Sequence, residues 1–504
     1  MISGDAYVLC VSLAGWLCGR ALSRGRLGAL ESWALGTAAS LGLLTLAAFV
    51  LALVGWGLPG PLLQLALLAG GIQLARVLAR PRAGQERTSS RRTSSGREST
   101  ARESTEREPT EATSPRWPWL VVLPSLALAV LMAGDWGQRE PAGNWDGMAN
   151  WTTQARHLAR SAGDPGEGLR ARVVGHADYP LMLPLAIALG WQWTGDETQH
   201  VPRLLAVLFV LLLAAASLGS FARVAGSRSA CFASAALLAA PALQLAARGQ
   251  IADLPLAVLT LLAGTRLVAS LQASARGDAD PLPATLTGFL IGLLPWMKNE
   301  GMLLALCLAL AALPAVIGRL KSHAPLLGRL LLGALLPLAL VRHFKHAWAP
   351  PDRMLEQLKP AMRNFVPDPE RWRIALDGVA REFVPLEFGY GLQGLLQGPW
   401  IERWGGLGAL CLVALLLGVL RRPRAAQGVP LLATFGWLAA LCLVYVLTIA
   451  DDPQWHVDTS LWRLLLQMLP FTLFGALAAW SREAPPVMLR DSIRPPDNTS
   501  PEAP

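Results

Sequence analysis

Long apolar stretches dominate this sequence, and they limit its possible folds more than any other feature. A chain inside a bilayer must satisfy its own backbone hydrogen bonds, so each stretch long enough to cross one is expected to be a helix. About thirteen such stretches fall at about residues 4–20, 32–56, 59–79, 117–134, 200–222, 229–246, 251–272, 283–298, 300–319, 324–348, 404–420, 429–450 and 461–480. The sequence therefore predicts an all-α polytopic membrane protein with about 13 transmembrane helices.

Composition agrees with this prediction and argues against two other classes of protein. Of the 504 residues, 53% are hydrophobic and only 16% are charged, whereas a soluble domain carries about 25% charged residues. The net charge of +9 comes mostly from short connections between apolar stretches, and no basic-aromatic motif accompanies it. We therefore expect the lipid bilayer as a partner and no nucleic acid.

The basic residues also predict an orientation. Clusters of Lys and Arg follow the first, third, fifth, seventh, ninth and eleventh stretches. With strict alternation of the spans, all these clusters lie on one side, which the positive-inside rule makes cytoplasmic. The Ala, Leu, Gly and Arg bias is typical of a bacterium with a high GC content. We therefore expect a multi-pass protein of a bacterial inner (plasma) membrane, with its polar loops on the extracytoplasmic face.

Changes in composition divide the chain into four parts. Two external loops, 135–199 and 349–403, carry apolar and aromatic residues and are expected to form amphipathic helices on the membrane surface. Residues 81–116 are rich in Ser, Thr, Arg and Glu and have no apolar periodicity, which indicates disorder. The parts are an N-terminal three-span unit (1–80), a disordered cytoplasmic linker (81–116), a membrane domain (117–480) and a disordered Pro-rich tail (481–504).

Asp146 is the first candidate site residue on the expected external side. It lies in the segment Asn144-Trp145-Asp146-Gly147-Met148-Ala149-Asn150-Trp151, just beyond a predicted span. Tryptophan settles at membrane interfaces, and a carboxylate held there has the chemistry of a general base toward a hydroxyl acceptor. Asp also suits the start of a helix as an N-cap, and the sequence leaves both interpretations open.

Two further motifs are expected at the same membrane face. His176-Ala177-Asp178-Tyr179-Pro180 offers polar groups, although its prolines also suit a simple turn before a surface or re-entrant helix. Asp253, in Ala252-Asp253-Leu254-Pro255, stands at the mouth of a predicted span, where an acid followed by Pro is often only a helix cap. Each motif thus has a functional and a purely structural interpretation.

Cationic residues complete the candidate site. Lys298 and Glu300 interrupt a long apolar stretch, which indicates function, although an exposed ion pair in a short turn is the simpler alternative. Arg463 stands at the expected external start of the last span, close to His456. Its planar guanidinium group can bind a phosphate. The alternative is that the Arg463 side chain extends to the lipid headgroups. The dispersed histidines and cysteines predict no metal site.

The order of these motifs resembles the GT-C superfamily of membrane glycosyltransferases, specifically bacterial proteins similar to protein O-mannosyltransferases and aminoarabinose transferases. The match runs through Trp-Asp…Trp…Ala-Arg, Asp-Tyr-Pro-Leu…Leu-Pro, Ala-Asp-Leu-Pro-Leu, Lys-Asn-Glu-Gly and Thr-Ser…Arg…Leu…Pro, and covers about residues 117–480. The N-terminal spans lie outside it. The resemblance implies an inverting transferase that takes a sugar from a polyprenyl-phosphate donor and gives it to an extracytoplasmic acceptor, with no cofactor.

The resemblance also implies roles for particular residues. Asp146 matches the catalytic base, Asp253 matches a second acidic position, and Lys298 and Arg463 match the residues that hold the donor phosphate. Many members have Glu after the base, and here Gly147 stands in that position. The residues expected to contact substrate are Trp145, Trp151, Arg156, His176, Asp178, Tyr179, Glu300 and His456.

Two other functions remain open. A lipid or solute transporter would place polar groups near the middle of the membrane and often shows repeated halves, and the sequence has no clear inverted repeat. A non-catalytic member or assembly factor with the same fold is the other alternative, because Gly147 departs from the family pattern. The sugar and the acceptor depend on the shape of the pocket, which the sequence does not define.

Overall fold

The computed structural model describes residues 3–23, 27–79, 118–134, 143–161, 175–277, 280–350, 358–383, 402–420, 426–448 and 452–481. Their regular structure is helical throughout, without a strand. Nine of the described helices are long and apolar enough to cross a membrane. They are α1 (Gly4–Ser23), α2 (Ala29–Leu53), α3 (Pro61–Ala79), α9 (His200–Ala239), α11 (Asp253–Ala275), α13 (Glu300–Ile317), α14 (Leu320–Ala347), α21 (Val429–Leu447) and α22 (Pro453–Trp480).

The remaining described helices are shorter. Three of them are apolar and fall on predicted spans: α5 (Pro118–Gly134) and α12 (Pro281–Met297), with 17 residues each, and α20 (Leu407–Leu420), with 14. The others are η1 (Gly147–Thr152), α6 (Thr153–Arg160), α8 (Met182–Thr194), α10 (Pro241–Arg248), α16 (Leu358–Phe365) and α17 (Pro369–Phe383).

The all-helical prediction is confirmed, and every predicted span falls on a helix. The count of nine differs from about thirteen because three helices are short and because two predicted spans share α9. That helix is broken at Gly226, whose φ of 76° is not helical, and α10 continues its second part. At about 1.5 Å per residue, 17 residues reach about 26 Å, so α5 and α12 lie at the lower limit for a span. Thirteen spans therefore stay a prediction.

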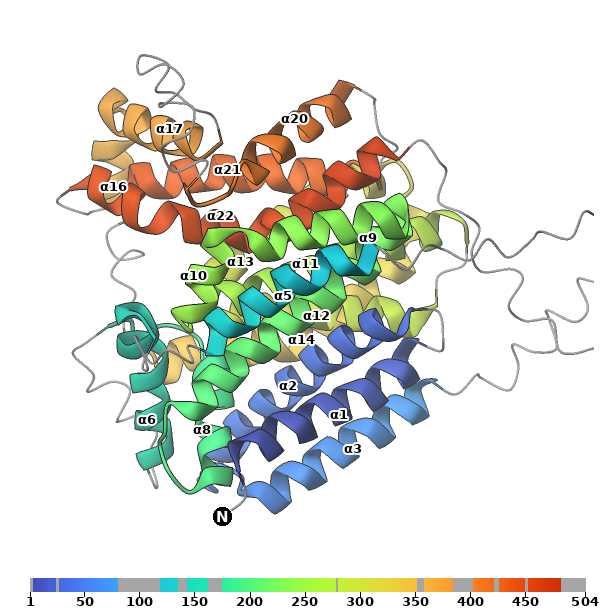
Figure 1. Cartoon of the computed structure of the whole chain (residues 1–504), viewed down its shortest axis with the longest axis vertical. Helices are drawn as coiled ribbons and strands as arrows, with labels where there is room; N and C mark the ends of the chain where they lie inside the picture. The colour runs from blue at the N-terminus through green and yellow to red at the C-terminus, as the bar shows by residue number, and fades with distance from the viewer. Residues whose placement is uncertain are drawn as a thin grey trace, which may run out of the picture.

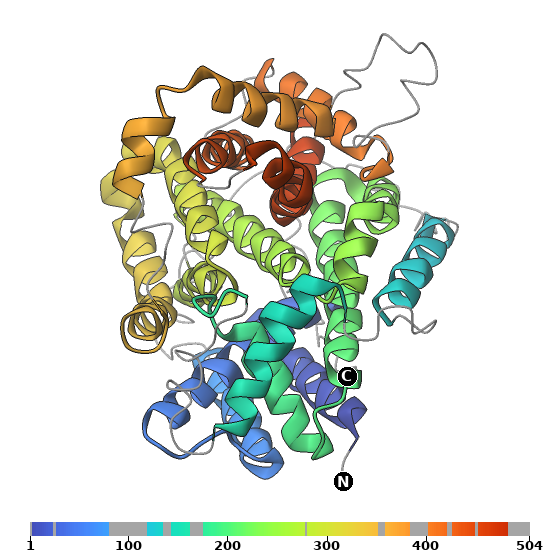
Figure 2. The ribbon, with the colours of Figure 1, turned by 90° about the vertical axis from the view of Figure 1, so that its left-hand side faces the viewer.

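Most of the long helices run side by side, and their ends gather in two layers (Figure 1). We call one the Asp146 end: it holds the starts of α1, α9, α11 and α22 and the ends of α12 and α14. Contacts between these helix ends define it, such as that of Lys298, after α12, with Asp253 of α11. The opposite layer is the Glu31 end, named after Glu31 in the first turn of α2. Figure 2 views the bundle from the side on which α6 crosses it.

The N-terminal three-span unit packs directly against the rest of the bundle. Gln64 of α3 accepts a hydrogen bond from the Trp193 indole of α8 at 2.8 Å. Trp296 of α12 donates to Thr45 of α2 at 3.2 Å, and its ring lies 5.2 Å from that of Phe49. These buried contacts make α1, α2 and α3 part of one packed structure with the segments that follow the linker.

A buried charge cluster at the Glu31 end also joins the N-terminal unit to later helices. Glu31 is 1% exposed, and its carboxylate accepts a hydrogen bond from Arg266 of α11. Arg223 of α9 lies 2.7 Å from the same oxygen. A buried carboxylate is tolerated only when it is paired, so this cluster holds three helices in register.

The described helices of the two predicted loops differ in character. Helices α6, α16 and α17 each carry charged residues on one face and apolar residues on the other, as expected for amphipathic helices. Helix α8 instead is buried along nearly all its length, because α6, α1, α2 and α9 pack around it. The surface-helix alternative for the segment after Tyr179 is therefore wrong for α8. The predicted linker 81–116 and nearly all of the tail 481–504 lie outside the described residues.

Glycines allow α1 and α2 to cross closely. A Cβ atom added at Gly19 would lie 1.7 Å from the Ser32 carbonyl oxygen, and one at Gly36 would lie 1.9 Å from that of Gly15. Close approach of backbones through small residues is a common way for helices to associate in membranes, where van der Waals contact replaces the hydrophobic effect.

We predict that Gly19→Ala destabilises the protein by about 1–3 kcal/mol, the usual cost of forcing atoms into a packed interior. Gly71→Ala is the matched control, because Gly71 lies inside α3 with no atom within 4 Å of an added Cβ. Since Ala favours a helix over Gly by about 1 kcal/mol, the control should be neutral or stabilising. Thermal unfolding in detergent would measure both. Equal Tm values would contradict the close packing of α1 on α2.

Candidate functional site

Asp146 is held by a residue 317 positions away in the chain. Its carboxylate accepts a hydrogen bond from Arg463 Nη1 of α22 at 2.6 Å and another from the side-chain amide of Asn150. Asp146 precedes η1 but makes no side-chain capping bond. Asn144 instead accepts the hydrogen bond of the Gly147 backbone N–H, at 2.9 Å. The helix-cap interpretation of Asp146 is therefore wrong.

The structure gives a steric reason for glycine at position 147. A Cβ atom added to Gly147 would lie 2.2 Å from the carbonyl oxygen of Gly249, and one added to Gly143 would lie 2.6 Å from the same oxygen. The backbone at the end of α10 thus lies against the glycines on either side of Asp146 in the sequence. A larger side chain at position 147 would clash with this backbone.

A second ion pair lies deeper, between α11 and the turn after α12. Lys298 Nζ lies 2.8 Å from Asp253 Oδ1 and 3.1 Å from Glu300. Lys298 is 2% exposed and Asp253 is fully buried, so the exposed-ion-pair interpretation is wrong. The two carboxylates beside the Lys298 side chain favour its charged form over the neutral amine. The ammonium therefore stays charged at neutral pH.

Helix α22 connects the two pairs. Arg463 binds Asp146, and Gln467, one turn further along, donates to Asp253 at 2.5 Å. Residues four apart share one face of a helix, so this face touches both acidic residues. Arg463 is therefore bound inside the protein and does not extend to the headgroups. Gln467 was missed by the sequence analysis because it is a lone amide inside an apolar stretch.

Aromatic rings surround the charges. The Tyr179 ring stacks with that of Trp151, at 5.2 Å, and with that of His176, at 4.7 Å. The pKa of Tyr179 is raised well above its usual value by burial and by nearby carboxylates, Glu300 and Asp146 among them. The phenol thus stays protonated.

Asp178 connects this aromatic group to two other helices. It accepts a hydrogen bond from the Asn299 side chain at 2.6 Å, and the Lys345 ammonium of α14 lies 3.4 Å from the same oxygen. His456, at the start of α22, lies nearby with its ring 5.4 Å from that of Tyr445. The sequence analysis missed Lys345, although a basic residue at the expected external end of a span was a signal that pointed to it.

Two predicted substrate contacts lie apart from the charge pairs. The Trp145 side chain is 63% exposed. Arg156 on α6 lies 3.6 Å from Glu197 and 6.0 Å from the ring of Trp191. It lines an open cavity of about 840 Å³ with Arg160 and other polar residues. The structure thus joins neither residue to Asp146 by a hydrogen bond or an ion pair.

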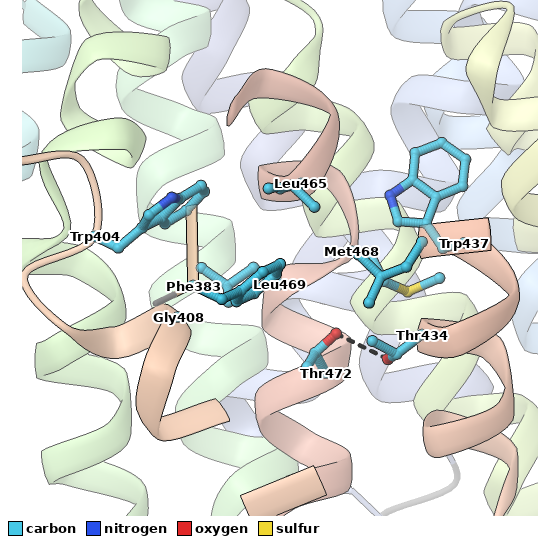
Figure 3. Close-up of a pocket in the computed structure, with 10 residues that line it drawn as sticks. Phe383, Trp404, Gly408, Thr434, Trp437, Leu465, Met468, Leu469 and Thr472 are labelled. Carbon is cyan, nitrogen blue, oxygen red and sulfur yellow. Dashed lines mark hydrogen bonds between the residues drawn. The ribbon is translucent and has the colours of Figure 1, made fainter. Parts of the chain in front are cut away.

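A small apolar cavity of about 20 Å³ lies where α17, α20, α21 and α22 meet (Figure 3). Trp404, Trp437 and Met468 are among its lining residues, and Thr434 and Thr472 form a hydrogen bond of 2.9 Å beside it. This cavity is apolar and too small for a sugar. The candidate site is therefore the group of paired charges around Asp146 and Asp253, whose polar groups bind one another in this structure.

We predict that Lys298→Met destabilises the protein by about 3–5 kcal/mol, because it leaves the buried Asp253 carboxylate without its direct partner. The double variant Lys298→Met/Asp253→Asn should regain most of this stability. Arg373→Met, which breaks an exposed pair on α17, should cause no measurable change. Thermal unfolding in detergent tests all three. A double variant as unstable as Lys298→Met would show that the pair is not the cause.

Comparison of this chain with known proteins finds no match among family models, curated proteins or solved structures. A functional interpretation therefore depends on the residues of the site and on the order of the motifs in the sequence. The geometry supplies the basis for such an interpretation. Two ion pairs and an aromatic stack meet at one end of an apolar helix bundle.

Proposed function

We propose that the protein is a membrane glycosyltransferase that moves a sugar from a polyprenyl-phosphate donor to an acceptor. One observation carries the proposal: Asp146, Asp253, Lys298 and Arg463 come from four distant segments and form two linked pairs at one end of the bundle. Buried ionisable groups in an apolar bundle are costly and are kept mainly for function. The resemblance to the GT-C motif order supplies the type of reaction.

Arg463 has the role of the donor-phosphate ligand in this proposal. Its guanidinium now binds Asp146, and its Nε is buried without a partner. A phosphate oxygen is a strong partner for a guanidinium, so an arriving donor competes with Asp146 for Arg463. Binding of the donor would thus release the Asp146 oxygens at the moment when a base is required.

Lys298 has a different role from the one expected. Two carboxylates, Asp253 and Glu300, already neutralise its charge. We infer that Lys298 positions Asp253 and Glu300, while Arg463 meets the phosphate. Asp253 Oδ2 and Glu300 Oε2 are buried without hydrogen-bond partners, so both carboxylates have an acceptor oxygen for a sugar hydroxyl.

The proposed reaction is a single displacement. The acceptor hydroxyl oxygen attacks the anomeric carbon as its proton passes to Asp146. The bond between that carbon and the phosphate oxygen breaks, and the electron pair leaves with the polyprenyl phosphate. Arg463 stabilises the charge that develops on this leaving group, which counts for more in a site of low dielectric than in water. The anomeric configuration is inverted.

The arrangement of the charges supports this proposal over a transporter. Asp253 begins α11, Lys298 follows α12 and Glu300 begins α13, so these charges lie at helix ends and not at mid-depth. Basic residues such as Arg76, Arg276 and Arg319 lie at the opposite end of their helices. By the positive-inside rule this supports a cytoplasmic Glu31 end and an extracytoplasmic site.

We predict that Asp146→Asn lowers transfer by about 10²–10⁴-fold, the usual contribution of a general base. Asn keeps the size and one hydrogen-bond acceptor, so folding should change little. The assay uses the purified full chain and polyprenyl-phosphate sugars extracted from membranes as donors. Asp377→Asn is the matched control, because Asp377 lies on the exposed face of α17, and it should transfer like the unaltered protein. Equal transfer by all three proteins would remove Asp146 from the reaction.

A further inference from the structure

One face of α14 changes from apolar to basic along its length. Its middle exposes four leucines, with exposed fractions of 71% for Leu331 and 64% for Leu335 among them. Its Asp146 end exposes three residues with nitrogen-bearing side chains. A spacing of three and four residues places all of them on one side of the helix. This α14 face consists of Leu331, Leu332, Leu335, Leu336, Arg342, His343 and His346.

The basic end of the α14 face lies beside the candidate site. Lys345 donates a hydrogen bond to the Asp178 carbonyl oxygen at 2.6 Å, and Asp178 in turn binds Asn299 at 2.6 Å. Arg342 is three residues before Lys345, about one turn or 5 Å along the helix axis. The other side of α14 packs on α12, next to it in Figure 1.

Two other helices also expose leucines beside an arginine, Leu13 with Arg20 on α1 and Leu74 with Arg76 on α3, but both arginines lie at the Glu31 end, away from the candidate site. Helix α3 exposes Leu62 and Leu63 where it begins, and its Arg76 lies at the opposite end. Helix α13 exposes Leu306 and Leu310, but it begins with an acid and has no basic residue. Favourable interaction with the helix dipole explains cations in the last turn of α14, but Arg342 lies a turn earlier. The basic end therefore needs another explanation.

We propose that the α14 face is the docking surface for the lipid donor, an inference that rests on the proposed transferase function. The phosphate binds Arg342, His343 and His346, and the isoprenoid chain lies along the leucines. From Leu331 to Arg342 the helix rises about 16 Å, which gives one chain a continuous apolar surface below its headgroup. Lys345, one turn from Arg342 on the same helix, joins this docking surface to Asp178.

The charge distribution indicates that the donor contacts this docking surface before it contacts the buried ion pairs. Lys298 and Arg463 are each engaged by carboxylates, whereas the guanidinium of Arg342 lies on the exposed face. A phosphate carried in the membrane therefore meets Arg342 before it reaches the buried charges. We therefore propose a lipid phosphate with one chain as the ligand of the α14 face, because one side of a single helix offers a surface for one chain.

The test measures binding of a labelled polyprenyl monophosphate to the full chain in nanodiscs of neutral phosphatidylcholine. We expect the variant Arg342→Gln/His343→Gln to bind at least about tenfold more weakly, since a hydrogen bond to a charged group is worth about one order of magnitude in affinity. Lys321→Gln is the matched control at the other end of α14, and it should bind like the unaltered protein. Thermal unfolding checks that the exposed substitutions leave the fold intact.

Each outcome decides the proposal. Weaker binding by the Arg342→Gln/His343→Gln variant, with normal binding by Lys321→Gln, supports the docking surface. Equal binding by all variants overturns it, while loss of transfer in Asp146→Asn would leave the transferase proposal intact. Full competition by phosphatidylglycerol would identify a general site for anionic lipids and overturn the commitment to a polyprenyl phosphate. Full competition by inorganic phosphate would overturn the role of the isoprenoid chain.

Discussion

The buried pair of Lys298 and Asp253 is the interaction on which the Asp146 end depends. Neither charge is stable alone in an apolar bundle, so α11 and the turn after α12 must meet. Gln467 then binds the same carboxylate, which fixes the rotation of α22. That rotation places Arg463 against Asp146. The geometry of the candidate site thus follows from the need to neutralise one buried charge.

The sequence predicted the helices well because hydropathy is a strong signal over about 20 residues. It predicted two stretches, 200–222 and 229–246, where the structure has the single helix α9, broken between them at Gly226. It left α8 open as a surface or a re-entrant helix, and the structure buries this helix among its neighbours. An apolar helix of 13 residues fits either environment, and only its neighbours decide between them.

The candidate site was predictable in its ionisable residues and not in their pairing. Asp146, Asp253, Lys298 and Arg463 were each visible as charges beside apolar stretches, and strict alternation placed them at one membrane face. The sequence did not show which charges pair with each other, because Arg463 pairs with Asp146, which lies 317 residues away. Asn150 and Gln467 were missed for a related reason: neutral amides carry no signal until a carboxylate lies within hydrogen-bond distance.

The cluster of Glu31, Arg223 and Arg266 has a consequence for any shortened form of this chain. The first three helices lie before the predicted linker, and Arg223 and Arg266 lie on helices of the core that follows it. Yet α2 now supplies the carboxylate that pairs with two arginines of that core. A shortened chain without Glu31 would leave both guanidinium groups among apolar helices without this counter-charge. The first three helices therefore neutralise charges of the rest of the bundle and do not form a separate unit.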